Sequence, residues 1–160
     1  MVVSNTSPLM NLAIIGRLDL PRHFFETIHI PEAVWNELVI RGKGKPGSEA
    51  LVAATWIQVH AVQNTHLVNA LREQLDPGES EAITLALEQK AELILLDESE
   101  GRRVASRYGL NKTGILGLLL RAKQENLIAS LKREMDQLQQ QAHFWINTNL
   151  YKRLLQSAGE

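Results

Sequence analysis

The chain of 160 residues contains no cysteine and has no excess charge of either sign. Without cysteine it forms no disulfide bond, no thiolate zinc site and no cysteine nucleophile, which fits a reducing compartment. It carries 17 Lys and Arg residues against 18 Asp and Glu residues, for a net charge of -1. The whole molecule therefore presents no positive field to a polyanion. Any contact with nucleic acid must come from a local basic patch.

Long hydrophobic runs are missing as well. No apolar segment approaches the roughly 20 residues needed to cross a bilayer. The N-terminus lacks the basic region and apolar core of a signal peptide. With 44% hydrophobic and 22% charged residues, the composition is that of ordinary globular proteins. We therefore expect a soluble, cytoplasmic protein with no membrane contact, and the length suits one domain with its own core.

Strand and helix signals alternate along the chain. Helical patterns separate five apolar or β-rich runs, which predict strands at residues 2–3, 27–30, 57–62, 92–96 and 110–112. This alternation predicts an α/β domain whose mostly parallel sheet is covered by helices on both faces. We expect that single domain to span residues 1–160, with a helical C-terminal extension from about residue 127. Asn147 or Thr148 is expected to cap the last helix of this extension.

Two polar positions directly follow predicted strands. Asp97 ends a buried apolar run, and Asn5 comes after the short strand at the start of the chain. The carboxyl ends of parallel strands open onto the ligand crevice of an α/β fold, so both side chains are candidates for a site. The alternative for Asp97 is that it caps the following helix. The alternative for the first position is a polar turn, in which Thr6 or Ser7 caps a helix at Pro8.

Two further carboxylates lie on predicted helices. Glu37 shares a helical face with apolar residues, where an unpaired charge is costly. Its alternative role is that of a border residue paired with a nearby Arg or Lys. Glu79 lies three residues after Asp76 and can complete a capping box, but its helical face continues along the apolar side. Glu81 lies nearer the solvent edge, so Glu79 is the better candidate for a site.

Together these positions indicate a crevice for a hard divalent cation. Oxygen ligands suit Mg²⁺ or Mn²⁺, and no cluster of His or Cys indicates zinc. Basic residues lie near the same elements: Lys43 follows the Glu37 helix, and Arg102 and Arg103 lie on the helix after Asp97. They are either part of a solvated surface or phosphate contacts beside the crevice.

Several stretches within about residues 1–130 carry a family resemblance. They are Val-Val-Ser-Asn-Thr-Ser-Pro-Leu at 2–9, Ile-Pro-Glu-Ala-Val-Trp-Asn-Glu-Leu at 30–38, Leu-Asp-Pro-Gly-Glu-Ser-Glu-Ala-Ile at 75–83, Leu-Ile-Leu-Leu-Asp-Glu at 93–98, and Gly-Arg-Arg-Val-Ala with Thr-Gly-Ile-Leu-Gly-Leu-Leu-Leu-Arg-Ala-Lys from 101 to 123. In these stretches and their order, the sequence resembles PIN-domain proteins. More narrowly, it resembles a toxin-like branch of predicted nucleic-acid-binding proteins.

The resemblance implies a three-layer α/β/α sandwich and a ribonuclease, a hydrolase of phosphodiester bonds that depends on Mg²⁺ or Mn²⁺. Carried over by position, the catalytic and metal-binding residues are Asn5, Glu37, Glu79 and Asp97. Ser7 or Thr6 is the implied polar neighbour. Many relatives are toxins of toxin–antitoxin pairs whose site an antitoxin protein masks, and many form homodimers. RNA is the implied substrate.

Asn5 departs from this family pattern, which usually has Asp at that position. An amide oxygen still binds a cation but supplies no charge, which could weaken metal binding by roughly a few kcal/mol. Two hypotheses follow. The first is a metal-dependent ribonuclease, weakened by the neutral residue. The alternative is a catalytically degenerate PIN domain that acts as an RNA-binding or protein-interaction module.

Overall fold

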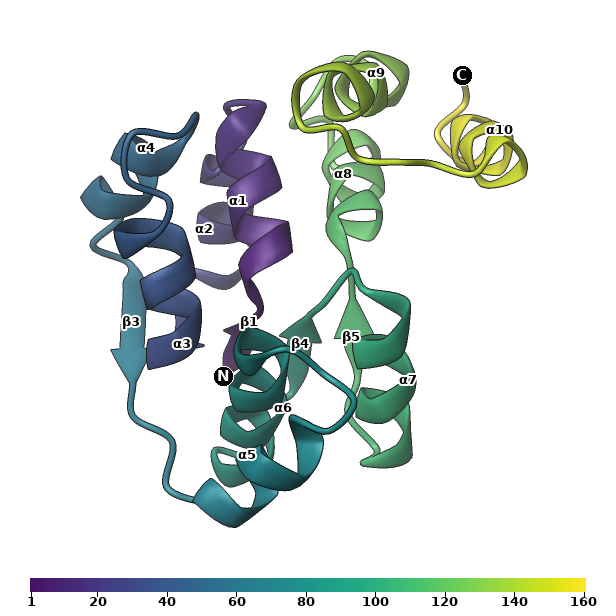
Figure 1. Ribbon diagram of the computed structural model, residues 1–160. Helices are drawn as coiled ribbons and strands as arrows, with labels where there is room; N and C mark the ends of the chain where they lie inside the picture. Colours follow the sequence, from purple (N-terminus) through teal and green to yellow (C-terminus); the bar gives the residue numbers. More distant parts are fainter.

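The computed structural model describes residues 1–160, and its centre is a sheet of five parallel strands (Figure 1). The strands are β1 (Val2–Ser4), β2 (Ile28–Pro31), β3 (Ile57–His60), β4 (Leu93–Leu95) and β5 (Lys112–Thr113). Their order across the sheet is β3-β2-β1-β4-β5. The central strands are almost wholly buried, which explains their continuous apolar sequence. The predicted sheet is confirmed, with every pair parallel and β3 at an edge.

Helices cover both faces of this sheet. One layer contains α1 (Thr6–Ile14), α2 (Asp19–Phe25), α4 (Ser48–Ala53) and α8 (Ile115–Gln124). The other is built around α6 (Pro77–Glu88), which lies against β1, β2 and β4 and contacts α3 (Glu32–Trp35), α5 (Thr65–Leu71) and α7 (Ser99–Arg107). The three-layer α/β/α prediction is confirmed. None of the helices is long and apolar enough to span a bilayer.

The strand order reverses at β1, which is the topological switch point of the sheet. From β1 the chain proceeds outward through β2 to β3, and it then returns to β4 on the other side of β1. Ser4 of β1 is aligned with Leu95 of β4, so these neighbouring strands end side by side. In open parallel sheets, a crevice forms beyond the carboxyl ends of strands at such a switch point. Asn5 and Asp97 are the residues that follow these two ends.

The helix after β2 changes its geometry at Glu37. Helix α3 continues directly into η1 (Asn36–Ile40), a π-turn in which the Arg41 amide donates to the Asn36 carbonyl at 2.8 Å. The extent of the predicted helix is confirmed, but the sequence pattern did not predict the π-turn. A π-turn accommodates an extra residue and often occurs at functional sites.

The C-terminal extension consists of α9 (Leu131–Gln141) and α10 (Thr148–Ser157), with α10 outermost (Figure 1). The expected helical start near residue 127 is wrong, because α9 begins at residue 131. Ser130 caps it by accepting a hydrogen bond from the Arg133 amide at 3.1 Å. Asn147, one of the two predicted caps, caps α10 by accepting hydrogen bonds from the amides of Asn149 and Leu150.

A partly buried ion pair joins this extension to the sandwich. Arg17, after α1, donates from both Nε (3.0 Å) and Nη2 (2.5 Å) to Glu134 Oε1 on α9. The Glu134 side chain is 2% exposed and that of Arg17 is 33% exposed. The hydrogen bond to Glu134 raises the pKa of Arg17. Removing Arg17 alone would leave a buried carboxylate without its charged partner.

We predict that Arg17→Ala lowers the free energy of unfolding by about 2 kcal/mol, less than for a fully buried pair because Arg17 is partly exposed. Replacing both residues in Arg17→Met/Glu134→Met should restore most of this stability, since no charge then remains buried. Urea denaturation of the wild type and of both variants measures the effect. A double variant no more stable than Arg17→Ala would show that the loss does not come from the unpaired carboxylate.

Candidate active site

Asn5 occupies the N-cap position of α1 at the end of β1. Its main-chain amide donates to the Leu95 carbonyl at 3.0 Å, which fixes it beside β4. Its side chain is 2% exposed, and Oδ1 accepts no hydrogen bond from the helix or from any other group. Asparagine at an N-cap ordinarily uses this oxygen to cap the helix, and leaving a buried acceptor unpaired costs about 1–3 kcal/mol. Asn5 therefore offers a buried oxygen that the fold itself does not use.

Glu37 is held at the same edge by the start of α1. Thr6 Oγ1 donates a hydrogen bond of 2.5 Å to Glu37 Oε2. Glu37 Oε1 lies so close to α6 that a Cβ atom at Gly78 would be 2.7 Å from it. Glycine thus lets the carboxylate approach the N-terminal end of α6, where the helix dipole favours negative charge. No Arg or Lys pairs with Glu37, so the alternative of a border ion pair is wrong.

Glu79 completes the capping box that its spacing predicted. Its amide donates to Asp76 Oδ1 at 2.7 Å, and its Oε2 accepts from the Asp76 amide at 3.3 Å. The side chain is only 4% exposed. Burial raises its pKa to about 7, and the nearby carboxylates of Asp76, Glu98 and Glu37 add to the rise. We call the strand ends and helix turn that carry Asn5, Glu37, Glu79 and Asp97 the acidic edge. The capping role does not take Glu79 away from it, and the Glu79 carboxyl titrates near neutral pH.

Asp97 does not cap α7, contrary to one of its two predicted roles. Glu98 takes the N-cap position of that helix, and it makes no capping bond. Asp97 Oδ1 instead accepts from the Ile115 amide of α8 at 3.0 Å, while Oδ2 is buried without a partner. Burial raises the pKa of Asp97 to about 6, and Arg102 opposes the rise. Gly114 permits this approach, since a Cβ atom there would collide with Asp97 Oδ1.

Glu98 is a further carboxylate of the edge, which the sequence did not distinguish from Glu100. Ser7 Oγ donates to Glu98 Oε1 at 2.6 Å, and the charge of Glu98 contributes to the raised pKa values of both Glu79 and Asp97. Glu100 instead pairs with Arg103 on the surface. The one signal in the sequence was that Glu98 takes the N-cap position of α7, where glutamate is a poor cap. Ser7, like its neighbour, thus binds a carboxylate rather than capping a helix at Pro8.

Glu81 lies on a different side of α6 from this group. Burial raises its pKa, and Glu32 is the carboxylate that adds most to the rise, while a hydrogen bond with the Ala33 backbone lowers it. Glu81 thus faces the start of α3, whereas Glu79 lies close enough to Gly101 of α7 that a Cβ atom there would be 3.2 Å from Oε1. Glu37 also adds to the rise in the pKa of Glu81, so both glutamates feel this edge carboxylate, and Glu79 stays the predicted ligand.

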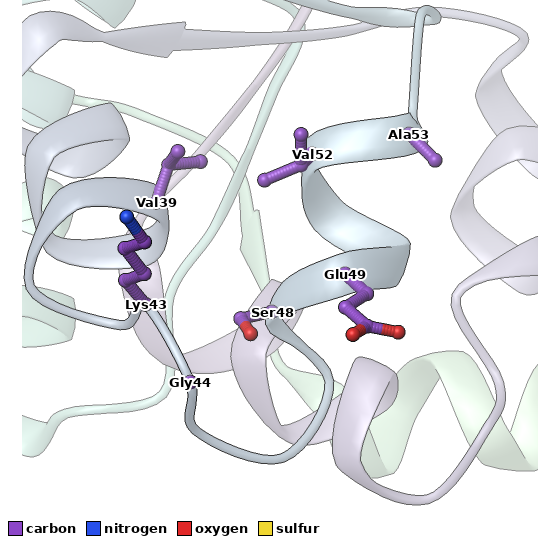
Figure 2. A pocket seen from close by; sticks show the side chains of 7 residues that line it. All are labelled: Val39, Lys43, Gly44, Ser48, Glu49, Val52 and Ala53. Atoms are coloured by element: carbon purple, nitrogen blue, oxygen red, sulfur yellow. The ribbon is translucent and has the colours of Figure 1, made fainter.

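The predicted basic contacts divide into three environments. Arg102 is half-buried, and its Nη1 donates to the Leu96 carbonyl at 2.8 Å, beside Asp97. Arg103 is exposed and engaged by Glu100. Lys43 lines a separate hollow of about 500 Å³ between η1 and α4, where it and Val39 lie across from Val52 (Figure 2). Of the three residues, only Arg102 contributes charge next to an edge carboxylate.

The hollow of Figure 2 contains none of the four candidate ligands. The oxygens of the acidic edge match the donor chemistry of Mg²⁺ or Mn²⁺, because two of them are buried and have no partner in the protein. No three Asp, Glu, His or Cys side chains stand where they could hold an ion by themselves. Thr6 and the Asp76 amide hold Glu37 and Glu79 instead, so a cation would have to compete with those hydrogen bonds.

A family model described as a PIN domain matches residues 1–160. With the parallel sheet and acidic edge in place, the chain therefore belongs to the PIN-domain family, whose fold is of the nuclease type. No curated protein matches the chain.

The raised pKa of Glu79 predicts a pH-dependent stability. In the unfolded chain this carboxyl ionises near 4.5, and in the folded chain near 7. The folded state then binds the proton more tightly, so the contribution to stability is present below pH 4.5 and is lost as pH rises through 7. We predict that Glu79→Gln, which keeps a capping-box residue, is more stable than the wild type by about 2 kcal/mol at pH 8 and nearly equal to it at pH 4.

Denaturation by urea at both pH values measures this difference. Glu100→Gln is the matched control, because it neutralises an exposed carboxylate on a nearby helix that lies outside the edge. Equal stability of Glu79→Gln and the wild type at pH 8 would contradict the buried, repelled state of Glu79.

Proposed function

We propose that this protein is a divalent-metal-dependent endoribonuclease of the PIN type, weakened by the neutral Asn5. The observation that carries the proposal is the pair of unpaired, buried oxygens, Asn5 Oδ1 and Asp97 Oδ2, at the ends of adjacent strands. Buried polar atoms are usually paired, so these two oxygens are free to bind a ligand. Glu88 Oε2 and Glu134 Oε2 are unpaired as well, and it is the position of Asn5 and Asp97 at adjacent strand ends that supports a cation site.

Mg²⁺ or Mn²⁺ would be held by Asn5, Glu37, Glu79 and Asp97. When bound, such an ion polarises the phosphodiester and lowers the pKa of the attacking water. The protein contributes orientation. Thr6 fixes the Glu37 carboxylate, and the Ile115 amide fixes one oxygen of Asp97, while the other has no partner in the protein. Glu79 must lose its proton near pH 7 to act as a ligand, so we expect activity to rise through neutral pH.

The finer parts of this proposal rest on the resemblance. We propose RNA as the substrate, the toxin component of a toxin–antitoxin pair as the biological role, and the cytoplasm as the location. An antitoxin covering the acidic edge and a second copy of the chain are the proposed partners. The excess of carboxylates at the edge suits a basic segment of an antitoxin.

The alternative is a degenerate PIN domain that binds RNA or protein without cleavage. The neutral Asn5 favours it, because three carboxylates attract a divalent ion less strongly than four. The hydrogen bonds that hold Glu37 and Glu79 favour it as well. Both readings predict the same fold, so only metal binding and cleavage separate them.

We predict slow cleavage of RNA by the wild type with Mn²⁺, cleavage at least about tenfold faster by Asn5→Asp, and none by Asp97→Ala. The added carboxylate supplies the missing charge, and the alanine removes a ligand. Gel analysis of a labelled RNA over a range of Mn²⁺ concentrations measures all three. Absence of cleavage by both the wild type and Asn5→Asp would sink the nuclease proposal.

Calorimetric titration with Mn²⁺ provides an independent measurement. Tight binding that disappears in Asp97→Ala would exclude the degenerate module. Glu100→Gln is again the control, since it removes one carboxylate of the same region without touching the edge. A loss of Mn²⁺ binding in this control would mean that general negative charge, rather than the four ligands, attracts the ion.

A further inference from the structure

A hollow of about 510 Å³ opens directly beside Asp97. Three segments that are far apart in the sequence line it: the start of α7, the turn from β5 into α8, and residues 144–154 of the C-terminal extension. The extension therefore forms a wall of a space that begins at a candidate catalytic residue. Of the four candidate ligands only Asp97 lines the hollow, so a molecule bound there would lie next to the Asp97 end of the acidic edge.

The C-terminal extension contributes an exposed aromatic side chain, Trp145, to this hollow. Trp145 is 79% exposed, although the next residue, Ile146, is buried at 4%. Asn147 follows at once and caps α10, so the backbone around Trp145 is fixed on its C-terminal side. A tryptophan ring left exposed forfeits the burial that usually stabilises this residue. A single exposed aromatic residue is common on a protein surface, but this ring also lines the hollow beside Asp97 together with Arg102 and Lys112.

Positive charge lies in the same hollow. Arg102 is fixed by its bond to the Leu96 carbonyl (2.8 Å), and Lys112 Nζ donates to Ser106 Oγ at 2.5 Å. Neither cation forms an ion pair. Asp97 is the only carboxylate in the lining. The hollow therefore combines two positioned cations, of which Arg102 lies beside Asp97, with an exposed ring, whereas the neighbouring edge is acidic.

We propose that this hollow, the Trp145 groove (Arg102, Lys112, Phe144, Trp145, Leu150 and Leu154), binds single-stranded RNA next to the acidic edge. Trp145 stacks on a base, and Arg102 and Lys112 contact the phosphate that joins this nucleotide to the one at the edge. The inference rests on the proposed function, because it assigns the path of that nuclease's substrate. The combination of ring and cations fits a nucleotide better than it fits an apolar helix.

The Trp145 groove would distinguish single-stranded RNA from duplex RNA, but it would not distinguish one base sequence from another. Every base has a face that can stack, so a single tryptophan tolerates any sequence. A base inside a duplex is already stacked on its neighbours, and freeing it costs energy. The groove would therefore favour single-stranded RNA over duplex and fix which bond of that strand reaches the edge.

The test measures binding without metal or cleavage. A fluorescein-labelled RNA of about eight nucleotides, methylated at every 2′-hydroxyl, is titrated in EDTA with the wild type, Trp145→Ala and Trp145→Phe, followed by anisotropy. Tyr108→Ala is the matched control, since Tyr108 is an exposed aromatic residue outside the groove. We expect Trp145→Ala to weaken binding about tenfold, Trp145→Phe to restore most of it, and the control to bind like the wild type. Lys112→Gln should lower the salt slope by about one.

Equal RNA affinity of Trp145→Ala and Tyr108→Ala would overturn the inference. So would a loss of self-association in Trp145→Ala, measured by sedimentation, because that result would assign Trp145 to a contact between two copies. The nuclease proposal fails separately. RNA binding that depends on Trp145, with no Mn²⁺ binding and no cleavage, would retain the groove and reject the nuclease. RNA cleavage that is unchanged in Trp145→Ala would retain the nuclease and reject the groove.

Discussion

Several carboxylates are buried beside one another, and most of them have no basic partner. The surrounding fold has to meet this constraint. Taking a carboxylate out of water is costly, and placing a second one near it adds repulsion. The raised pKa values of Glu79 and Asp97 express both costs. The fold offsets them mainly with neutral donors: a threonine hydroxyl for Glu37 and main-chain amides for Glu79 and Asp97. Arg102, beside Asp97, adds the charge of a counter-ion.

The topology explains why this constraint can be met. The switch point at β1 brings the carboxyl ends of β1 and β4 together, where a crevice forms in parallel sheets. Helix α6 passes beside it and contributes its N-terminal turn, where glycine allows Glu37 to approach. The core beneath is a single cluster of buried residues that includes both central strands. The stability lost at the edge is thus carried by a continuous apolar core, as expected where function requires strain.

Local patterns predicted those features that depend on neighbours in the sequence. The run from Asp76 to Glu79 specified a capping box because all its partners lie within four residues. The place of Asp97 followed from the strand before it. The bonds from Ser7 to Glu98 and from Ile115 to Asp97 could not be predicted, since each joins residues that only the tertiary fold brings together. The start of α9 was placed too early because the apolar pattern continues through the turn that Ser130 ends.

The π-turn at Glu37 has a consequence for how chains of this kind diverge in length. A π-turn is a helix with one residue inserted, and each residue turns an α-helix by about 100°. Because the π-turn absorbs the extra residue, loss of one residue here would return the helix to α geometry, with Glu37 in place and the later side chains on the same faces. Chains with and without the insertion can therefore share both the edge carboxylate and the surface beyond it. An alignment without a gap at this turn would instead pair positions that differ by about 100° around the helix.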